Sequence, residues 1–277
     1  MAKDATNNLW QRDLAQSHMK IGNVLTELRK FDEAKENHDS GVAIMERLSR
    51  SDPTNADWQR ELAWGYDNIG DRLRTMAGPD GYGTASVARF DHAPLAQALK
   101  NYRLSLDITL RLAEAHPGNR LWQYDLGVRQ GHIGELLMVQ NDFAGAMKAY
   151  EAAQTIFRPL VESDPKNVSW RHNLSLTYDR IGNILFGQDR LADALTNYRH
   201  SLAIMENLIA ADPENVHWQL EVVHLHWRLA TSGDDAGRRW GTMVEILQRL
   251  KAADKLPAEQ TSWLSDALEH LVELQAK

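Results

Sequence analysis

The chain has 277 residues and no cysteine, so it can form neither a disulfide bond nor a thiolate metal site. It has no apolar run of about 18 residues, which a membrane-spanning helix would need, and its first residues lack the apolar segment of a signal peptide. A net charge of −7 argues against a general nucleic-acid binder, because such a protein needs a basic surface to displace counterions from phosphates. We therefore expect a cytoplasmic protein that contacts neither membrane nor nucleic acid.

Motifs that carry catalysis are also missing. The segment "GPDGYG" at residues 78–83 lacks the Lys-Ser/Thr ending of a phosphate-binding loop, and no H-E-x-x-H sequence or nucleophile elbow is present. His217, His224 and His226 come nearest to a metal pattern, but His226 falls about 200° around a helix from His224. We expect no enzymatic activity, no cofactor and no metal.

What the sequence does contain is repetition. "DPTNADWQREL" at residue 52 returns as "DPKNVSWRHNL" at 164 and "DPENVHWQLEV" at 212, with a looser copy, "HPGNRLWQYDL", at 116. Five tryptophans mark the register with spacings of 48, 64, 48 and 48 residues, so one unit carries an insertion of 16 residues. These tryptophans are Trp10, Trp58, Trp122, Trp170 and Trp218.

Each tryptophan opens a predicted helix of about 18–20 residues, because apolar residues follow at offsets of 4, 11 and 15 on one helical stripe. At helical spacing the tryptophans are expected to be core. Asparagines three residues ahead are expected as N-caps, namely Asn55, Asn119, Asn167 and Asn215. A glycine inside the helix implies a close approach by a neighbour, since glycine costs about 1 kcal/mol there. These glycines are Gly22, Gly70, Gly134 and Gly182.

A second amphipathic helix follows in each unit. We call the set of equivalent positions in the repeated units the frame. The second helix carries an alanine at one frame position: Ala34, Ala98, Ala146 or Ala194. Four residues later stands a ring, His38, Tyr102, Tyr150 or Tyr198, and we expect the three tyrosines in the core. Neither helix could bury its apolar stripe alone, whereas stacked helical hairpins would bury all the stripes in one continuous core.

The glycine, the alanine 12 residues later and the aromatic residue 4 further resemble the tetratricopeptide repeat. This resemblance implies an all-α fold, a right-handed α-solenoid of stacked hairpins with about eleven helices. The unit here is 48 residues instead of about 34, so each helix is expected to be longer. Such long-helix variants are similar to those of large bacterial signalling proteins, where they follow nucleotide-binding switch, cyclase or caspase-like domains.

We expect one solenoid over residues 1–277, ending in a capping helix at 255–277. Its predicted units are 7–54, 55–118, 119–166, 167–214 and 215–254. The insertion, near 77–94, is interpreted either as a tolerated surface loop or as a partner contact through Tyr82, Arg89 and Phe90.

In tetratricopeptide arrays the first helices line a concave groove, and the resemblance places exposed groove positions around the frame glycine. The candidate binding residues there are Asn23, Trp64, Asp67, Asp71, Glu135, Leu176, Asp179 and Asn183. Lys20, Arg180 and Arg228 lie beside them and partly offset their acidic charge. We therefore expect a protein or peptide partner with basic or amide-rich character, and not a clamp for a carboxylate.

Three functions remain open. The first is a peptide-binding or protein-binding scaffold, within a larger signalling or regulatory protein. The second is structural self-assembly, in which the exposed ends of the array stack on one another. The third is a sensor or regulatory arm of a multidomain ATPase, cyclase or caspase-like peptidase.

Overall fold

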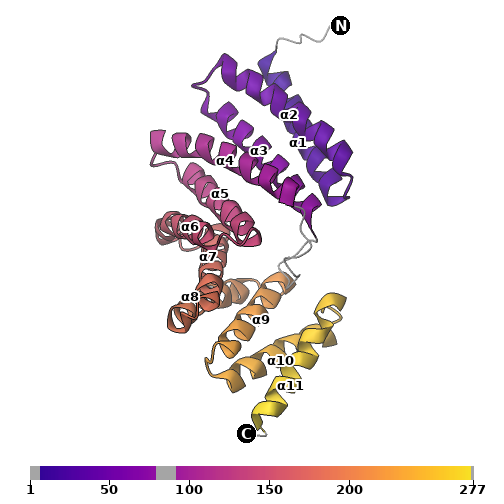
Figure 1. Ribbon diagram of the computed structural model, residues 1–277, viewed down its shortest axis with the longest axis vertical. Helices are drawn as coiled ribbons and strands as arrows, with labels where there is room; N and C mark the ends of the chain where they lie inside the picture. The colour runs from indigo at the N-terminus through magenta and orange to yellow at the C-terminus, as the bar shows by residue number, and fades with distance from the viewer. Residues whose placement is uncertain (1–6, 79–91, 276–277) are drawn as a thin grey trace. The chain divides into compact units, whose positions relative to one another are not determined.

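The structure is a computed structural model that describes residues 7–78 and 92–275. Within these ranges it consists of eleven α-helices and one short 3-10 helix, and it contains no strand (Figure 1). The all-α prediction, with its number of helices, is confirmed. Residues 79–91, with Tyr82, Arg89 and Phe90, lie outside the described residues, so the role predicted for the insertion stays a prediction.

The chain divides into two compact units, Met1–Ile156 and Phe157–Lys277. The first unit holds five helices and part of a sixth: α1 (Asn8–Glu27), α2 (Phe31–Ser51), α3 (Ala56–Ala77), α4 (His92–Ala115), α5 (Arg120–Val139) and α6 (Phe143–Ser163), which crosses the boundary. Consecutive helices from α1 to α5 pack side by side, and α1 also touches α3. The prediction of one continuous solenoid over the whole chain stays a prediction.

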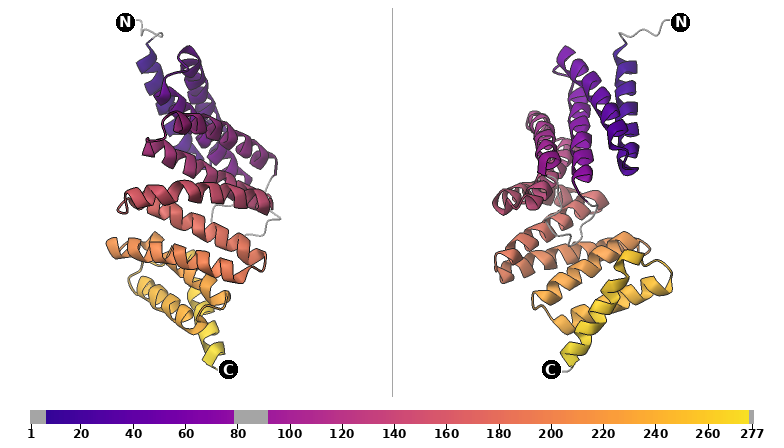
Figure 2. Two further views of the ribbon diagram at one scale, coloured as in Figure 1. Left: turned by 90° about the vertical axis from the view of Figure 1, so that its left-hand side faces the viewer. Right: turned by 45° about the vertical axis from the view of Figure 1, so that its right-hand side comes forward.

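The second unit is built in the same way. It holds α7 (Val168–Gly187), α8 (Leu191–Ala211), α9 (Val216–Thr231), α10 (Ala236–Ala252), the 3-10 turn η2 (Ala258–Gln260) and α11 (Thr261–Gln275). Figure 2 shows the pair α7–α8 followed by the pair α9–α10, with α11 against α10. We call α1, α3, α5, α7 and α9 the first helices, and their partners α2, α4, α6, α8 and α10 the second helices.

The repeated "D-P-x-N" segment forms the turn between hairpins. Asn55 accepts a hydrogen bond from the backbone at the start of α3, and Asn7, Asn119, Asn167 and Asn215 do the same for the other first helices. Asp52 Oδ1 accepts from the Thr54 backbone nitrogen at 3.1 Å, which closes the turn. The predicted N-caps are confirmed, and they satisfy backbone donors that a helix leaves open at its N-terminus.

The frame glycine and the frame ring meet inside each hairpin. A Cβ atom added at Gly134 would lie 2.7 Å from Tyr150 Cε1, and one at Gly182 would lie 2.5 Å from Tyr198 Cε1. Gly70 meets Tyr102 and Gly22 meets His38 in the same way. The predicted close approach is therefore confirmed, and the approaching group is the ring of the second helix. The three tyrosine rings are buried, as expected, and so is His38.

The expectation that the five repeated tryptophans lie in the core is only partly met. Only Trp122 is buried, at 9% exposure, whereas Trp58, Trp170 and Trp218 are half-buried and Trp10 is 54% exposed. The tryptophan lies in the first turn of its helix, at the edge of the packed face, so its burial depends on whether a neighbouring hairpin covers that edge. The apolar residue four positions later lies deeper and is buried in every first helix except α1.

Helix α1 differs from the other first helices. Leu14 and Ile21 are 50% and 49% exposed, while the residues at the same frame positions of α5, Leu126 and Ile133, are 7% and 6% exposed. In the described part of the chain, α2 and α3 cover only the opposite side of α1. An apolar stripe of the kind that other first helices bury is therefore left uncovered.

Candidate functional site: the polar face of the first helices

In three hairpins the residue after the frame glycine hydrogen-bonds the ring of its own hairpin. The Tyr102 hydroxyl donates to Asp71 Oδ1 at 2.7 Å, and the Tyr198 hydroxyl donates to Asn183 Oδ1 at 2.9 Å. Burial, with Asp71 beside it, raises the pKa of Tyr102 well above its ordinary value, and burial raises the pKa of Tyr198 to about 12. The side chains of Asp71 and Asn183 are half-buried, so each can also face a partner.

Asn23 occupies the same frame position in α1. Its Oδ1 lies 2.9 Å from His38 Nε2, and its amide donates to Asn68 Oδ1 of α3 at 3.4 Å. Burial, and then the nearby Arg72, lower the pKa of His38 to about 4, so His38 is neutral at pH 7. The histidine therefore replaces the frame tyrosine as a neutral, hydrogen-bonded core ring.

Asp67 belongs to a buried polar network that joins three helices of the first unit. Arg129 of α5 places Nη2 2.8 Å from Asp67 Oδ2 of α3, and its Nε donates to Ser105 Oγ of α4 at 2.6 Å. Both charged side chains are buried. Burial raises the pKa of Asp67, and Arg129 opposes that rise by favouring the carboxylate. The pair fixes α5 against the hairpin before it.

Asp179 is tied in a similar way in the second unit. Arg228 Nε of α9 lies 2.8 Å from Asp179 Oδ1 of α7, and Arg180 Nη1 lies 3.0 Å from Asp179 Oδ2. Arg228 Nη1 also donates to Asn183 Oδ1. In both units, the aspartate three residues before the frame glycine is therefore neutralised by an arginine of the next first helix.

These contacts correct the expected exposure of two groove residues. Asp67 and Asp179 are buried at 7% and 8% exposure and are already paired, because the next first helix supplies an arginine at hydrogen-bonding distance. The half-buried carboxylates that remain at predicted groove positions are Asp71 and Glu135, both in the first unit. The acidic character of the predicted groove is thus concentrated on α3 and α5.

The two apolar candidates are half-buried. Trp64 of α3 packs against the core of the first unit, and Leu176 lies on α7 in the second unit. Trp64 is on the same helix as Asp71, so the first unit holds both an apolar and an acidic candidate. That the eight residues bind a partner stays a prediction.

The histidines of α9 do not gather as a metal site. His226 is buried, and the ring of His224 contacts that of Trp263 in a tilted arrangement with ring centroids 4.3 Å apart. Burial, then neighbouring arginines, lower the pKa of each to about 4. His217 instead lies near Glu221, one turn along the same helix, and near His172, which is 45 residues earlier in the sequence.

Contacts between first helices share one spacing in three helix pairs, α1–α3, α3–α5 and α7–α9. An arginine or histidine two residues after one tryptophan meets a carboxylate three residues after the next tryptophan. Arg12 Nε donates to Glu61 Oε1 at 2.7 Å, Arg60 Nε lies 2.6 Å from Asp125 Oδ2, and His172 Nε2 lies 2.8 Å from Glu221 Oε2. We call each such pair a rung.

Among the residues that the structure describes, no helix is long and apolar enough to cross a membrane.

Comparison with known proteins is consistent with this geometry. A sequence model described as "Tetratricopeptide repeat" matches residues 170–213, which span the hairpin of α7 and α8. No curated protein matches the sequence.

The solved structures that resemble the chain include the following three. BtubC from P. vanneervenii is 14% identical, with a TM-score of 0.56 over 89% of this chain and 91% of that one. A MamA double mutant from RS-1 (13% identity, TM-score 0.43) covers 87% of this chain and 98% of its own. PilF of Pseudomonas aeruginosa (13% identity, TM-score 0.43) covers 96% of this chain and 98% of its own. At this identity the likeness to BtubC concerns the fold alone.

The repeat frame therefore has three independent supports. The glycine–ring contact recurs in four hairpins, the asparagine cap recurs in five first helices, and the family match falls on one hairpin. Repeats of this kind generally mediate contacts between proteins and are typically not catalytic. Residues 170–213 therefore match the tetratricopeptide repeat, and three other described hairpins share its glycine–ring contact.

Proposed function

We propose that the chain is a non-catalytic interaction scaffold that binds an extended, basic or amide-rich peptide segment along its first helices. The observation that carries this proposal is the pair of half-buried carboxylates on adjacent first helices, Asp71 of α3 and Glu135 of α5. Trp64 of α3 adds apolar contact on the same helix, and Asn23 of α1 adds an amide. Such a mixture suits a peptide that offers both cationic and backbone donor groups.

The charge distribution makes the proposal specific. Asp67 is buried and paired with Arg129, whereas Asp71 and Glu135 are half-buried and so can reach a partner. Asp71 uses Oδ1 for Tyr102, and a carboxylate has a second oxygen that can accept from a partner. Arg74 lies 3.9 Å from Asp71 and weakens the local negative field. A partner cation must therefore compete with Arg74, so we expect moderate affinity that falls as salt is added.

The test begins with selection of short random peptides on the immobilised protein. We expect enrichment of lysine, arginine, asparagine and glutamine, and about tenfold weaker binding of a selected peptide by the variant Asp71→Asn, Glu135→Gln. Both substitutions keep the side-chain shape, and the amide oxygen introduced at position 71 can still accept the hydrogen bond from Tyr102. Binding can be measured by fluorescence anisotropy.

The matched control removes the same charge from second helices. Asp107 of α4 and Glu151 of α6 are exposed, so Asp107→Asn with Glu151→Gln alters net charge equally but leaves the first helices untouched. It should bind the selected peptide as the unaltered protein does. Equal losses in both double variants, or selection of acidic peptides, would refute the proposed face.

The uncovered stripe of α1 supports a second candidate function, association between copies of this chain. Leu14 and Ile21 hold frame positions that other hairpins bury, so the surface fitted to cover them is a helical hairpin of the same kind. Leu268 and Val272 of α11 are exposed apolar residues through which a second copy could make that contact.

Light scattering after size-exclusion chromatography tests this association. We expect a mass that rises with concentration, and a constant monomer mass for Leu14→Glu with Ile21→Glu. The control, Leu104→Glu with Leu110→Glu, changes exposed leucines of α4 and should leave the rise intact. A monomer at every concentration for the unaltered chain would contradict self-association.

A further inference from the structure

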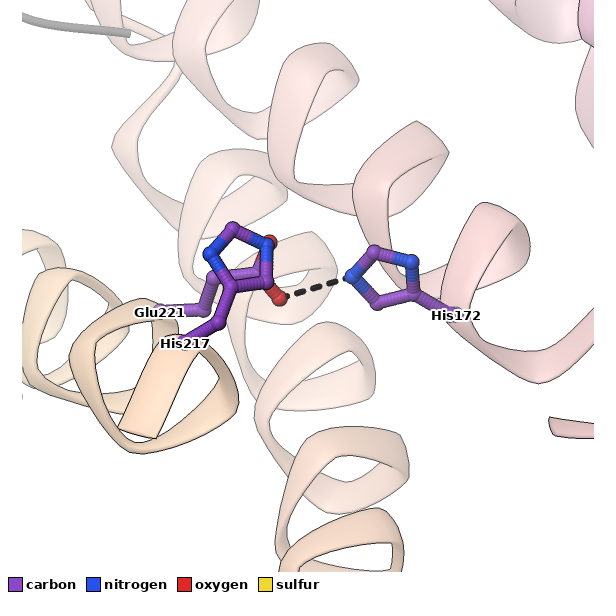
Figure 3. Close-up of side chains that lie close together, drawn as sticks. All are labelled: His172, His217 and Glu221. Carbon is purple, nitrogen blue, oxygen red and sulfur yellow. Dashed lines mark hydrogen bonds and ion pairs between the residues drawn. The ribbon is translucent and has the colours of Figure 1, made fainter. Parts of the chain in front are cut away.

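One cluster in the second unit differs from the other rungs of the described chain. His172 projects from α7, and His217 and Glu221 project one turn apart from α9, so that three side chains converge from two helices (Figure 3). We propose that these three residues form a binding site for a divalent transition-metal ion of the zinc class, which bridges α7 and α9.

The distances suit such an ion. Glu221 Oε2 lies 2.8 Å from His172 Nε2, and Glu221 Oε1 lies 3.1 Å from His217 Nε2. One potential ligand atom from each residue lies within 4.8 Å of the other two. Tetrahedral zinc with bonds of about 2.0–2.1 Å requires ligand atoms about 3.3 Å apart. Rotation of His217, whose side chain is 67% exposed, can close the remaining difference without moving the backbone.

The other rungs show that this arrangement is more than a repeated ion pair. Arg12–Glu61 and Arg60–Asp125 occupy the same frame positions as His172–Glu221, and each uses an arginine, which cannot bind a metal. Here the arginine is replaced by histidine. The residue just before the tryptophan is also replaced: it is Leu9, Asp57, Leu121 and Ser169 in the other units but His217 in this one. The histidines at 172 and 217 both belong to this one rung, and with Glu221 they form a set of two imidazoles and one carboxylate.

That set has a defined chemistry. Imidazole nitrogen suits Zn²⁺, Cu²⁺ and Ni²⁺, and two histidines with one glutamate leave a fourth tetrahedral position for water. When the ion binds, each histidine offers the lone pair of Nε2 and carries its proton on Nδ1. In the hydrogen bond to Glu221 the ring proton of neutral His172 is on Nε2, so metal binding requires that this proton be exchanged through solvent onto Nδ1. Binding therefore weakens in acid, where protons compete for the imidazoles.

Isothermal titration of the full chain with ZnCl₂ at about pH 7.5 tests the site. We expect one saturable ion per chain, and affinity lowered at least about tenfold by His172→Ala or by Glu221→Gln. The control His200→Ala removes an exposed histidine of α8 in the same unit and should leave binding unchanged. Because the ion joins two helices of the folded state, zinc at about 100 times its Kd should raise the Tm by about 5 °C.

A second variant separates metal binding from folding. His172→Arg with His217→Leu rebuilds a rung of the Arg60–Asp125 type, so the protein should fold normally, bind no zinc and show no shift in Tm when zinc is added. Cobalt should give the visible absorption of a tetrahedral site in the unaltered protein alone. Absence of saturable binding by the unaltered chain, or binding that survives in this variant or in His172→Ala, would overturn the proposal.

Discussion

Replacing Arg129 by methionine should destabilise the first unit by about 3–5 kcal/mol. Arg129 and Asp67 are both buried, and the guanidinium also donates to Ser105 Oγ. Methionine fills much of the same volume but leaves the Asp67 carboxylate without its counter-charge in a desolvated site. Urea unfolding followed by circular dichroism would measure the loss as a lower midpoint.

Two comparisons show whether the buried charge causes the loss. Arg60→Met removes a partly exposed pair between the same two helices, with Arg60 39% exposed, and should cost no more than about 1 kcal/mol. The double variant Arg129→Met, Asp67→Leu removes both charges and should recover most of the stability. If the single and double variants were equally unstable, packing around Arg129 would be the cause instead.

The loss should also depend on pH. Burial raises the pKa of Asp67 above its unfolded value. Arg129 is the group that most strongly lowers this pKa, and the variant lacks it. A raised carboxyl pKa means that the folded state of the Arg129→Met variant holds a proton that the unfolded state has released. The variant therefore recovers stability as the pH falls towards the folded pKa and loses it as the pH rises. If the free energy of unfolding lost in the Arg129→Met variant stayed constant between neutral and mildly acidic pH, an unpaired charge on Asp67 could not be its cause.

Gly134→Ala should destabilise the first unit by about 2 kcal/mol, although alanine is the better helix former. A Cβ atom at Gly134 would lie 2.7, 2.8 and 2.9 Å from three atoms of the Tyr150 ring. That ring is 2% exposed, so it cannot move away without displacing its neighbours. The overpacking therefore exceeds the gain in helix propensity, and thermal unfolding would record it as a lower Tm.

The control lies three residues away on the same helix. At Gly131 of α5 an added Cβ would meet nothing within 4 Å, so Gly131→Ala should stabilise the protein by about 1 kcal/mol. Opposite signs at the two positions are the expected result. Stabilisation by both substitutions would show that the glycine–ring contact is not tight and that the frame glycine has another role.

Sequence periodicity predicted the hairpin well because its signals are local. The asparagine caps, the frame glycine and the ring four residues after the alanine each depend on contacts within one hairpin or its turn. The pattern recurs from hairpin to hairpin, so its copies reinforce one another. The buried tyrosines and the close approach at the frame glycines followed from that pattern alone, whereas the ring as the approaching group did not.

The sequence was less informative about contacts between first helices. Arg129 and Arg228 neutralise Asp67 and Asp179 from different frame positions, 7 and 10 residues after their tryptophans, so no common spacing indicates them. Trp10 carries the same pattern as Trp122, yet its exposure depends on whether a neighbouring hairpin covers it. The grouping of His172 with His217 requires the rung geometry, which is defined only when two consecutive units are aligned in space.

The most direct test of a partner-binding face on the first helices is to map a selected peptide by amide chemical shifts of the isotope-labelled protein. We expect the largest shifts at Asn23, Trp64, Asp71 and Glu135. Shifts confined to the second helices, with these four amides unmoved, would contradict a binding face on the first helices.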